Sequence, residues 1–165
     1  MKKIIIATLV LSLMLCFAAC GSEPATNDNN APAECWTYTH NGTAITMNAD
    51  AAPVVTALGE PKTYTEETSC AFEGLDKTYF YGSFYIQTYP VGDKDYIFGV
   101  WFADDSVTTD EGVYVGMSQA EVESAYGAES FNGTNAYIMT KGKSTLTVIL
   151  TDGAVTSIQY DAVVE

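Results

Sequence analysis

Few side chains in this sequence carry the chemistry that catalysis or metal binding needs. The 165 residues include one histidine, His40, and all seven basic residues are lysines, so arginine is absent. A metal centre built from two or three imidazoles is therefore excluded, and so is a bidentate guanidinium clamp on a phosphate or carboxylate. A serine or cysteine nucleophile would have His40 as its only imidazole base, and this histidine precedes an Asn-Gly turn. We predict no catalytic residue, no resident metal and no cofactor.

The densest group of acids is the stretch from Asp104 to Glu111 (DDSVTTDE). Carboxylate oxygens in a flexible loop are ligands for Ca²⁺. The stretch departs from the EF-hand pattern, because it has no glycine at the sixth place and Val115 stands where the bidentate glutamate should be. We expect a solvated linker between two halves of the domain, with weak calcium binding as the alternative.

Two of the four cysteines, Cys35 and Cys70, lie beyond the N-terminal segment. Thiols in an exported domain commonly pair, and we expect a disulfide between these two residues. Two buried thiols that do not pair are the alternative, since a metal pair would need further ligands that the sequence lacks.

The N-terminus has the pattern of a bacterial export signal. Two lysines precede an apolar run over residues 4–19, which is shorter than the roughly 20 residues of a membrane-spanning helix. The run ends in Phe-Ala-Ala before Cys20, which resembles the lipobox of bacterial lipoproteins. The resemblance implies that residues 1–19 are removed and that a lipid on Cys20 anchors the protein to the cell membrane, on its extracytoplasmic side. A secretory signal cut after Ala19 is the alternative.

The acidity of the chain limits its partners. Residues 20–33 contain no large apolar side chain and are expected to form a flexible tether, followed by one domain over residues 34–165. The chain has 21 acidic and 7 basic residues, a net charge of -14, and loss of two lysines with the signal gives 5 − 21 = −16. Nucleic acid is excluded as a natural partner, because its phosphates require clustered basic side chains. The membrane should be contacted through the lipid on Cys20 alone.

Local signals predict a β-hairpin at the start of the domain and then a short helix. Two strand-like runs, 36–40 and 43–47, flank an Asn-Gly pair, whose residues both tolerate positive φ. The helix should begin at an Asp50 cap and end at Gly59.

The same helix signal returns later in the chain. Setting Gly127 on Gly59 aligns the two segments without a gap and brings Ser118 onto the Asp50 cap position. Ser118 and Glu121 form a capping box, in which each side chain satisfies a backbone N–H of the other. We interpret the match as an internal duplication.

Three strand-like runs follow each helix, separated by tight turns. They are 78–81, 84–89 and 96–102 in the first unit, and 136–140, 145–151 and 155–160 in the second. Apolar and polar residues alternate, as in a sheet with one covered face. The predicted fold class is α+β: tandem α-β-β-β repeats, about 45–103 and 113–161, form one antiparallel sheet with two short helices packed on one face, preceded by the hairpin.

The second unit also has a recognisable sequence pattern. It reads Gly116-Met117-Ser118-x-x-Glu121-Val122-x-x-x-Tyr126-Gly127, and its last strand, after an Asp-Gly turn, begins Val155-Thr156-Ser157-Ile158. This pattern resembles the repeat of β-lactamase-inhibitor-protein-like domains and of small outer-membrane-assembly lipoproteins, the SmpA/OmlA group. The resemblance covers most of residues 45–160, although the first unit lacks the Gly-Met-Ser start. It implies a tandem-repeat fold and protein-binding relatives.

Aromatic residues crowd the strands of the first unit. Because helices can cover one face of a sheet, the other face should expose tyrosine and tryptophan, which are enriched at protein interfaces and also stack on sugars. The candidate binding face comprises Tyr79, Tyr81, Tyr85, Tyr89 and Trp101. We expect a non-enzymatic, lipid-anchored binding module for an envelope or extracellular protein. A carbohydrate binder or hydrolase using the same tyrosines and nearby acids is the alternative, as are aromatic residues that simply decorate the strands.

Overall fold

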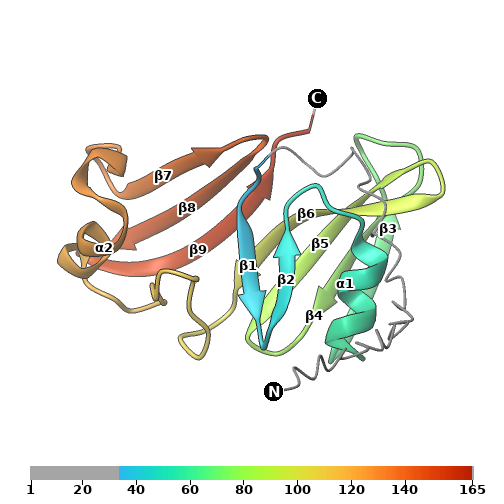
Figure 1. The fold of residues 1–165 in the computed structure, drawn as a ribbon, viewed down its shortest axis with the longest axis horizontal. Helices are drawn as coiled ribbons and strands as arrows, with labels where there is room; N and C mark the ends of the chain where they lie inside the picture. Colours follow the sequence, from blue (N-terminus) through green and yellow to red (C-terminus); the bar gives the residue numbers. More distant parts are fainter. Residues whose placement is uncertain (1–33, 165) are drawn as a thin grey trace, which may run out of the picture.

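The computed structural model describes residues 34–164, which form two antiparallel sheets and two α-helices (Figure 1). The elements are β1 (Thr37–His40), β2 (Thr43–Thr46), α1 (Ala51–Leu58), β3 (Thr63–Thr68), β4 (Leu75–Phe80), β5 (Phe84–Val91), β6 (Lys94–Phe102), α2 (Gln119–Tyr126), the short 3-10 helix η1 (Ala128–Ser130), β7 (Ala136–Lys141), β8 (Ser144–Thr151) and β9 (Ala154–Ala162). The fold is α+β, as predicted.

Strands β3 to β9 form one seven-stranded sheet in the order β3-β4-β5-β6-β9-β8-β7. Each half of this sheet is a series of consecutive antiparallel hairpins, and the halves meet where β6 pairs with β9. That junction runs from Gly99 opposite Asp161 to Trp101 opposite Gln159. The last strand of one half therefore lies antiparallel to the last strand of the other.

Hairpin β1–β2 stays outside the seven-stranded sheet and lies against one of its faces. The Asn-Gly turn is confirmed, with φ values of 48° and 83° at its two residues. The Tyr38 ring of β1 packs against three aromatic rings of the sheet, with centroids 4.9 Å from Phe102, 5.3 Å from Phe84 and 6.1 Å from Tyr160. Tyr38 is buried and forms the centre of the contact between the hairpin and the sheet.

Both helices begin where the sequence predicts. The Asp50 carboxylate accepts a hydrogen bond from the first turn of α1, and the Ser118 backbone N–H donates to the Glu121 carboxylate at 2.9 Å. Each helix has eight residues, too few for independent stability, so packing must hold it in place. Val54 of α1 and Val122 of α2 are buried in the common core and provide that packing.

The connector between β6 and α2, expected to be a solvated linker, is part of the packed structure. Val113 is fully buried in the core. The Asp110 carboxylate accepts hydrogen bonds from the Thr39 backbone N–H at 3.0 Å and from its hydroxyl at 3.1 Å. The Tyr126 hydroxyl at the end of α2 donates to Glu111 at 2.8 Å. The prediction of a solvated linker is therefore wrong for this part of the connector, because Asp110 is hydrogen-bonded to the hairpin and Glu111 to α2.

Strand β3 was not predicted, so the first half has four strands where three were expected. All six of its residues are exposed, and its sequence, TYTEET, therefore lacks the apolar alternation that marks a half-buried strand. Its threonines and tyrosine favour strands. Pairing with β4 along its whole length supplies the backbone hydrogen bonds that hold β3 in the sheet.

Candidate binding surface

The seven-stranded sheet has one face that carries the hairpin and both helices. The side chains of one transverse row on that face belong to the core or pack against it: Tyr79, Ile86, Val100, Tyr160, Leu146 and Met139. On the same face the Tyr137 hydroxyl of β7 donates to Glu123 of α2 at 2.9 Å. We call this the covered face and the opposite one the open face.

Strand register collects the aromatic residues of the open face into one row. Phe80 pairs with Tyr85 and Tyr85 with Trp101, so three successive strands each contribute a ring. The Phe80 and Tyr85 rings stack, with centroids 4.4 Å apart and planes inclined by 22°. Beyond Trp101 the row continues into Gln159 of β9. We call Phe80, Tyr85 and Trp101 the aromatic row.

A polar row runs beside the aromatic row, two residues along each strand. Its members are Thr65, Thr78, Gln87, Gly99, Asp161, Thr145 and Thr140. At its centre a Cβ on Gly99 would lie 2.9 Å from the Tyr160 carbonyl oxygen and 3.4 Å from the Trp101 ring. Glycine is therefore required there, because any side chain would collide with the Tyr160 backbone of the neighbouring strand β9.

Asp161 is the charged member of the polar row, which contains no lysine. Its carboxylate accepts a hydrogen bond from the Gln159 amide at 2.7 Å. Burial nevertheless raises the pKa of Asp161, because desolvation outweighs the hydrogen bond. A partly desolvated carboxylate beside an indole ring is a polar group that a ligand could hydrogen-bond.

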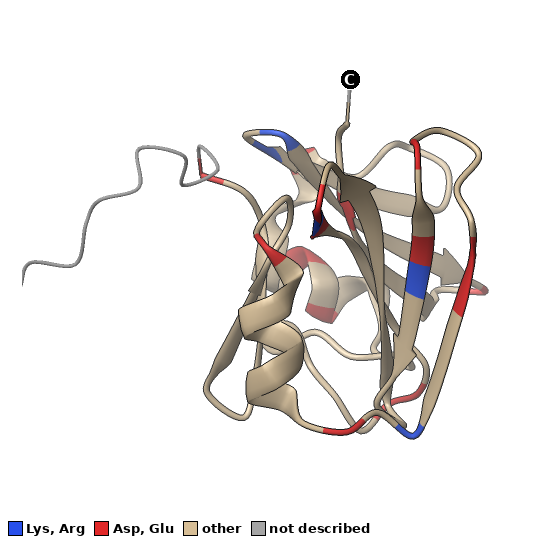
Figure 2. Cartoon of the chain, turned by 90° about the vertical axis from the view of Figure 1, so that its right-hand side faces the viewer, with Lys and Arg blue, Asp and Glu red and all other residues tan. Residues whose placement is uncertain are grey.

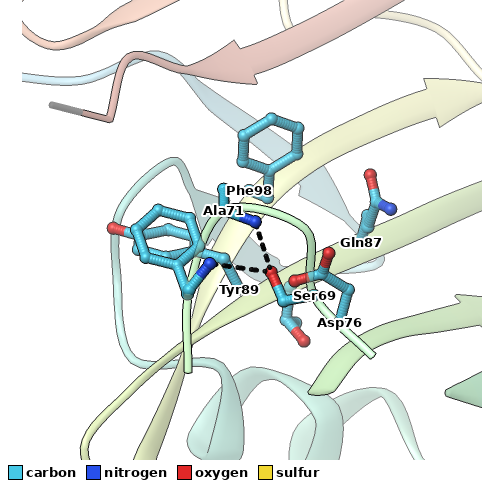
Figure 3. Close-up of a pocket in the computed structure, with 8 residues that line it drawn as sticks. Ser69, Ala71, Asp76, Gln87, Tyr89 and Phe98 are labelled. Carbon is cyan, nitrogen blue, oxygen red and sulfur yellow. Dashed lines mark hydrogen bonds between the residues drawn. The ribbon is translucent and has the colours of Figure 1, made fainter. Parts of the chain in front are cut away.

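A small pocket adjoins the polar row where the β3–β4 loop folds over β5 (Figure 3). The Ser69 hydroxyl accepts hydrogen bonds from two loop N–H groups, at 3.4 Å from Ala71 and 3.2 Å from Phe72. The pocket has a volume of about 90 Å³, room for one small apolar side chain. It is lined by Ser69, Ala71, Phe72, Asp76, Gln87, Thr88, Tyr89 and Phe98.

Acidic residues outnumber basic ones along the chain, 21 against 7, and Figure 2 marks both kinds on the cartoon. Two of the lysines are already paired: Lys77 with Asp95 at 2.7 Å and Lys94 with Asp50 at 2.9 Å. The domain as a whole therefore carries a net negative charge, which favours a partner with complementary positive charge.

The five predicted binding residues lie in three different environments. Tyr85 and Trp101 lie on the open face, as expected. Tyr79 and Tyr81 lie on the covered face, where they pack against the core, and the prediction that they share the face of Tyr85 is wrong. Tyr89 is buried and its hydroxyl donates to Asn48 at 2.9 Å. The error arises because residues on neighbouring strands share a face by register, which the sequence of each strand does not reveal.

Four residues of the surface were missed by sequence reasoning. Phe80 alternates with Tyr79 and Tyr81 and could have been found from that alternation. Gln159 and Asp161 lie on this surface because β9 pairs with β6. Phe72 lies on it because the β3–β4 loop packs its ring against Tyr89. No local signal marks these three residues.

The predicted disulfide is not formed: no bond joins Cys35 and Cys70. Cys35 is buried beside the Asn48 amide, 3.8 Å from its nitrogen, whereas Cys70 is exposed in the β3–β4 loop. The export context suggested pairing, but the fold assigns the two thiols to different environments.

His40, the one histidine, serves the packing of the hairpin. Its ring is half-buried against Phe84, with centroids 4.7 Å apart. Its nitrogens lie 3.1 Å from the Tyr38 hydroxyl and 3.1 Å from the Asn41 amide. Within residues 34–164 no group of three or more His, Cys, Asp or Glu side chains is arranged to hold a metal ion.

Comparisons with protein-family models, with curated proteins and with solved structures found no match. The functional argument therefore rests on the geometry of the surface. In the described part of the chain, neither helix has the length or apolar character needed to cross a membrane. The predicted signal (1–19), Cys20 and the tether (20–33) lie outside the described residues.

Proposed function

We propose that this protein is a non-enzymatic, lipid-anchored binding module that recognises an envelope or extracellular protein through its open face. The aromatic row is the observation that carries the proposal. Three rings lie side by side on the open face of the sheet, and the polar row beside them adjoins a pocket with room for one small apolar side chain. Binding energy at protein interfaces concentrates in such aromatic residues and adjoining pockets.

The lipid anchor is a separate part of the proposal and is supported by the sequence around Cys20. A domain with this excess of acids is repelled by an anionic membrane surface, so the lipid and tether would carry the attachment. Cys20→Ser should move the protein from the detergent phase to the aqueous phase, or leave it as an unprocessed precursor. Unchanged processing and partitioning would refute the anchor.

Capture from solubilised cell envelopes tests the open face. The wild-type protein and Tyr114→Ala, which removes an exposed tyrosine of the connector, should retain the same partner in stoichiometric amount. Trp101→Ala should lose that partner while keeping its unfolding temperature within a few degrees. Equal capture by Trp101→Ala and wild type would reject the open face as the binding surface.

A carbohydrate ligand is the second candidate, favoured by one observation. Trp101 is flanked by Gln159 and Asp161, and a ring beside an amide and a carboxylate can stack on a sugar and bind its hydroxyl groups. A polysaccharide array separates the candidates: glycan binding that requires Trp101, without a captured protein, favours the second.

We also propose that the two halves arose by duplication and that the chain is a divergent relative of β-lactamase-inhibitor-protein-like domains. The mirrored order β4-β5-β6 and β9-β8-β7 supports this, as do the capped helices of equal length that precede each set. Strand β3 has no counterpart in the second half.

A further inference from the structure

The two edges of the seven-stranded sheet differ in how they are protected. At one edge, β7 is covered by neighbouring backbone and by a tryptophan. Phe131 forms a bridge with Tyr137, and Asn132 donates to the Ala136 carbonyl at 2.8 Å. Further along β7, the Trp36 indole N–H donates to the Met139 carbonyl at 2.8 Å. These contacts use hydrogen-bonding groups that an added strand would need.

At the other edge, β3 is left open. It pairs with β4 from Thr63 opposite Phe80 to Thr68 opposite Leu75 without a bulge. Every residue of β3 is exposed, and none is proline. Within residues 34–164 no hydrogen bond reaches the outer edge of this strand from another segment. A straight, uncovered edge strand of this length is a template for pairing with a further strand.

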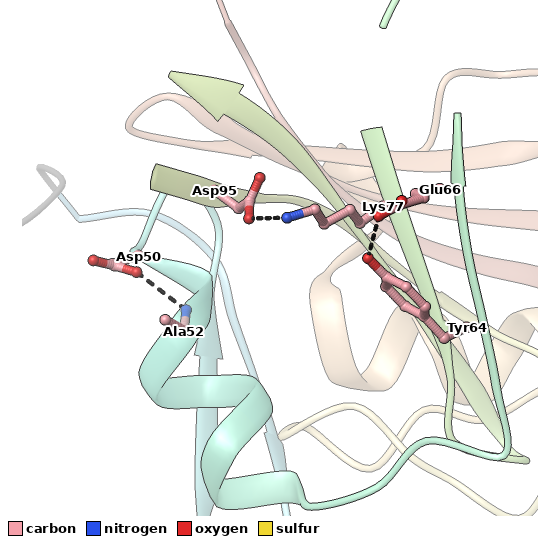
Figure 4. A network of polar contacts seen from close by, with 6 residues as sticks. All are labelled: Asp50, Ala52, Tyr64, Glu66, Lys77 and Asp95. Atoms are coloured by element: carbon pink, nitrogen blue, oxygen red, sulfur yellow. Dashed lines mark hydrogen bonds and ion pairs between the residues drawn. The ribbon is translucent and has the colours of Figure 1, made fainter. Parts of the chain in front are cut away.

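The charges along β3 are acidic, and the lysine opposite makes its close ion pair with Asp95 of β6 while it interacts with Glu66 at longer range. Lys77 is the cross-strand neighbour of Glu66, but its ammonium group binds Asp95 at 2.7 Å. Glu66 instead accepts a hydrogen bond from the Tyr64 hydroxyl at 2.6 Å, and Figure 4 shows the two separate contacts. Glu67, on the other face of the strand, lies opposite Asp76.

We propose that β3 is a docking edge to which a basic, extended segment of a partner protein adds as an eighth strand. Backbone hydrogen bonds would supply affinity. Lysine or arginine side chains would supply selectivity by facing Glu66 on one face of the strand or Glu67 on the other, according to the register. The exposed Tyr64 ring, packed on Tyr79 with centroids 5.0 Å apart, offers a flat surface for the stem of such a side chain.

A second copy of this chain is disfavoured as the occupant. Antiparallel pairing of two β3 strands would bring Glu66 and Glu67 of both copies into one small area, in a protein whose net charge is already -14. Like charges on an edge strand oppose self-association, whereas they attract a basic segment.

This inference rests on the proposed function in requiring a protein partner, but it concerns a different surface. The probe is a blocked heptapeptide of alternating lysine and valine, added to the full-length protein in detergent. One comparison peptide has glutamate for lysine. Another is N-methylated at two successive central residues, so that both of its edges lose hydrogen-bond donors while its charge is kept.

The lysine peptide should bind and should slow amide hydrogen exchange in residues 63–68. The N-methylated peptide should bind at least about tenfold more weakly, and the glutamate peptide should not bind. Glu66→Lys with Glu67→Lys should weaken binding of the lysine peptide by about tenfold or more, whereas the matched charge change Asp105→Lys with Glu129→Lys should have little effect.

Three results would overturn the proposal. The first is that the N-methylated peptide binds as tightly as the lysine peptide, and the second is that the lysine peptide slows exchange in β7 or on the open face instead of in β3. The third is that the two charge-reversed proteins lose affinity for the lysine peptide equally. Concentration-dependent protection of β3 without peptide, together with a dimeric mass, would overturn it in favour of self-pairing. Trp101→Ala should leave peptide binding unchanged. A loss of envelope capture by that variant alone therefore concerns the open face, and the two proposals can fail separately.

Discussion

Replacing Val122 by alanine tests whether helix α2 is held on the sheet by the contact that the structure shows. Val122 is fully buried and is the buried residue of this helix. Loss of two methyl groups removes about 1.6 kcal/mol of transfer free energy, at about 0.8 kcal/mol each. A residual cavity of about 30 Å³ would add about 0.7 kcal/mol. The free energy of unfolding should therefore fall by about 2 kcal/mol.

The equivalent valine of the first helix and an exposed valine give the comparison. Val54→Ala in α1 should lower the free energy of unfolding slightly less, because Val54 is 8% exposed and its surroundings can relax. Val163→Ala, at a side chain 44% exposed, should change it by no more than about 0.5 kcal/mol. Denaturant unfolding followed by circular dichroism and by tryptophan fluorescence measures all three variants.

The reasoning is refuted by a specific result. If Val122→Ala unfolds at the same denaturant concentration as the wild type, with an unchanged slope, α2 is not packed through this residue. An equal loss of unfolding free energy in Val163→Ala and Val122→Ala would also contradict the reasoning, since burial of the side chain would then not explain the loss.

Three further predictions follow from the electrostatics and the thiols. Hydrogen bonds from the Ser118 hydroxyl and then from its backbone N–H lower the pKa of Glu121. This carboxylate therefore stabilises the fold above its unfolded pKa, and the contribution is lost as pH falls through its folded value. Glu121→Ala should lower the melting temperature at pH 7, and the difference from wild type should shrink below about pH 4. Burial raises the pKa of Asp161, so the contribution of this carboxyl group to stability is lost as pH rises through its folded pKa. Asp161→Asn should therefore raise the melting temperature at pH 7 but not at about pH 3. An equal shift of the melting temperature at both pH values would contradict this. Cys70 is exposed and Cys35 buried, so a thiol reagent should modify Cys70 rapidly and Cys35 only after unfolding, and absence of thiols in the denatured, unreduced protein would instead indicate a disulfide.

The sequence alone determined those features that depend on neighbouring residues. The Asn-Gly turn, the caps at Asp50 and Ser118 and the alternation along β8 are local, because each is specified by backbone preferences or hydrogen bonds within a few positions. They were sufficient to predict an α+β fold with two short helices and an antiparallel sheet.

The tertiary structure alone decided which residues share a surface. Trp101 meets Gln159 and Asp161 because β6 pairs with β9, and Phe80 stacks on Tyr85 because the β4–β5 register sets them opposite each other. A shift of one residue in either pairing would send these side chains to the other face. Such pairings are selected by the packing of the whole core, including the hairpin held against the sheet by its aromatic contacts, and no segment of the sequence specifies them by itself.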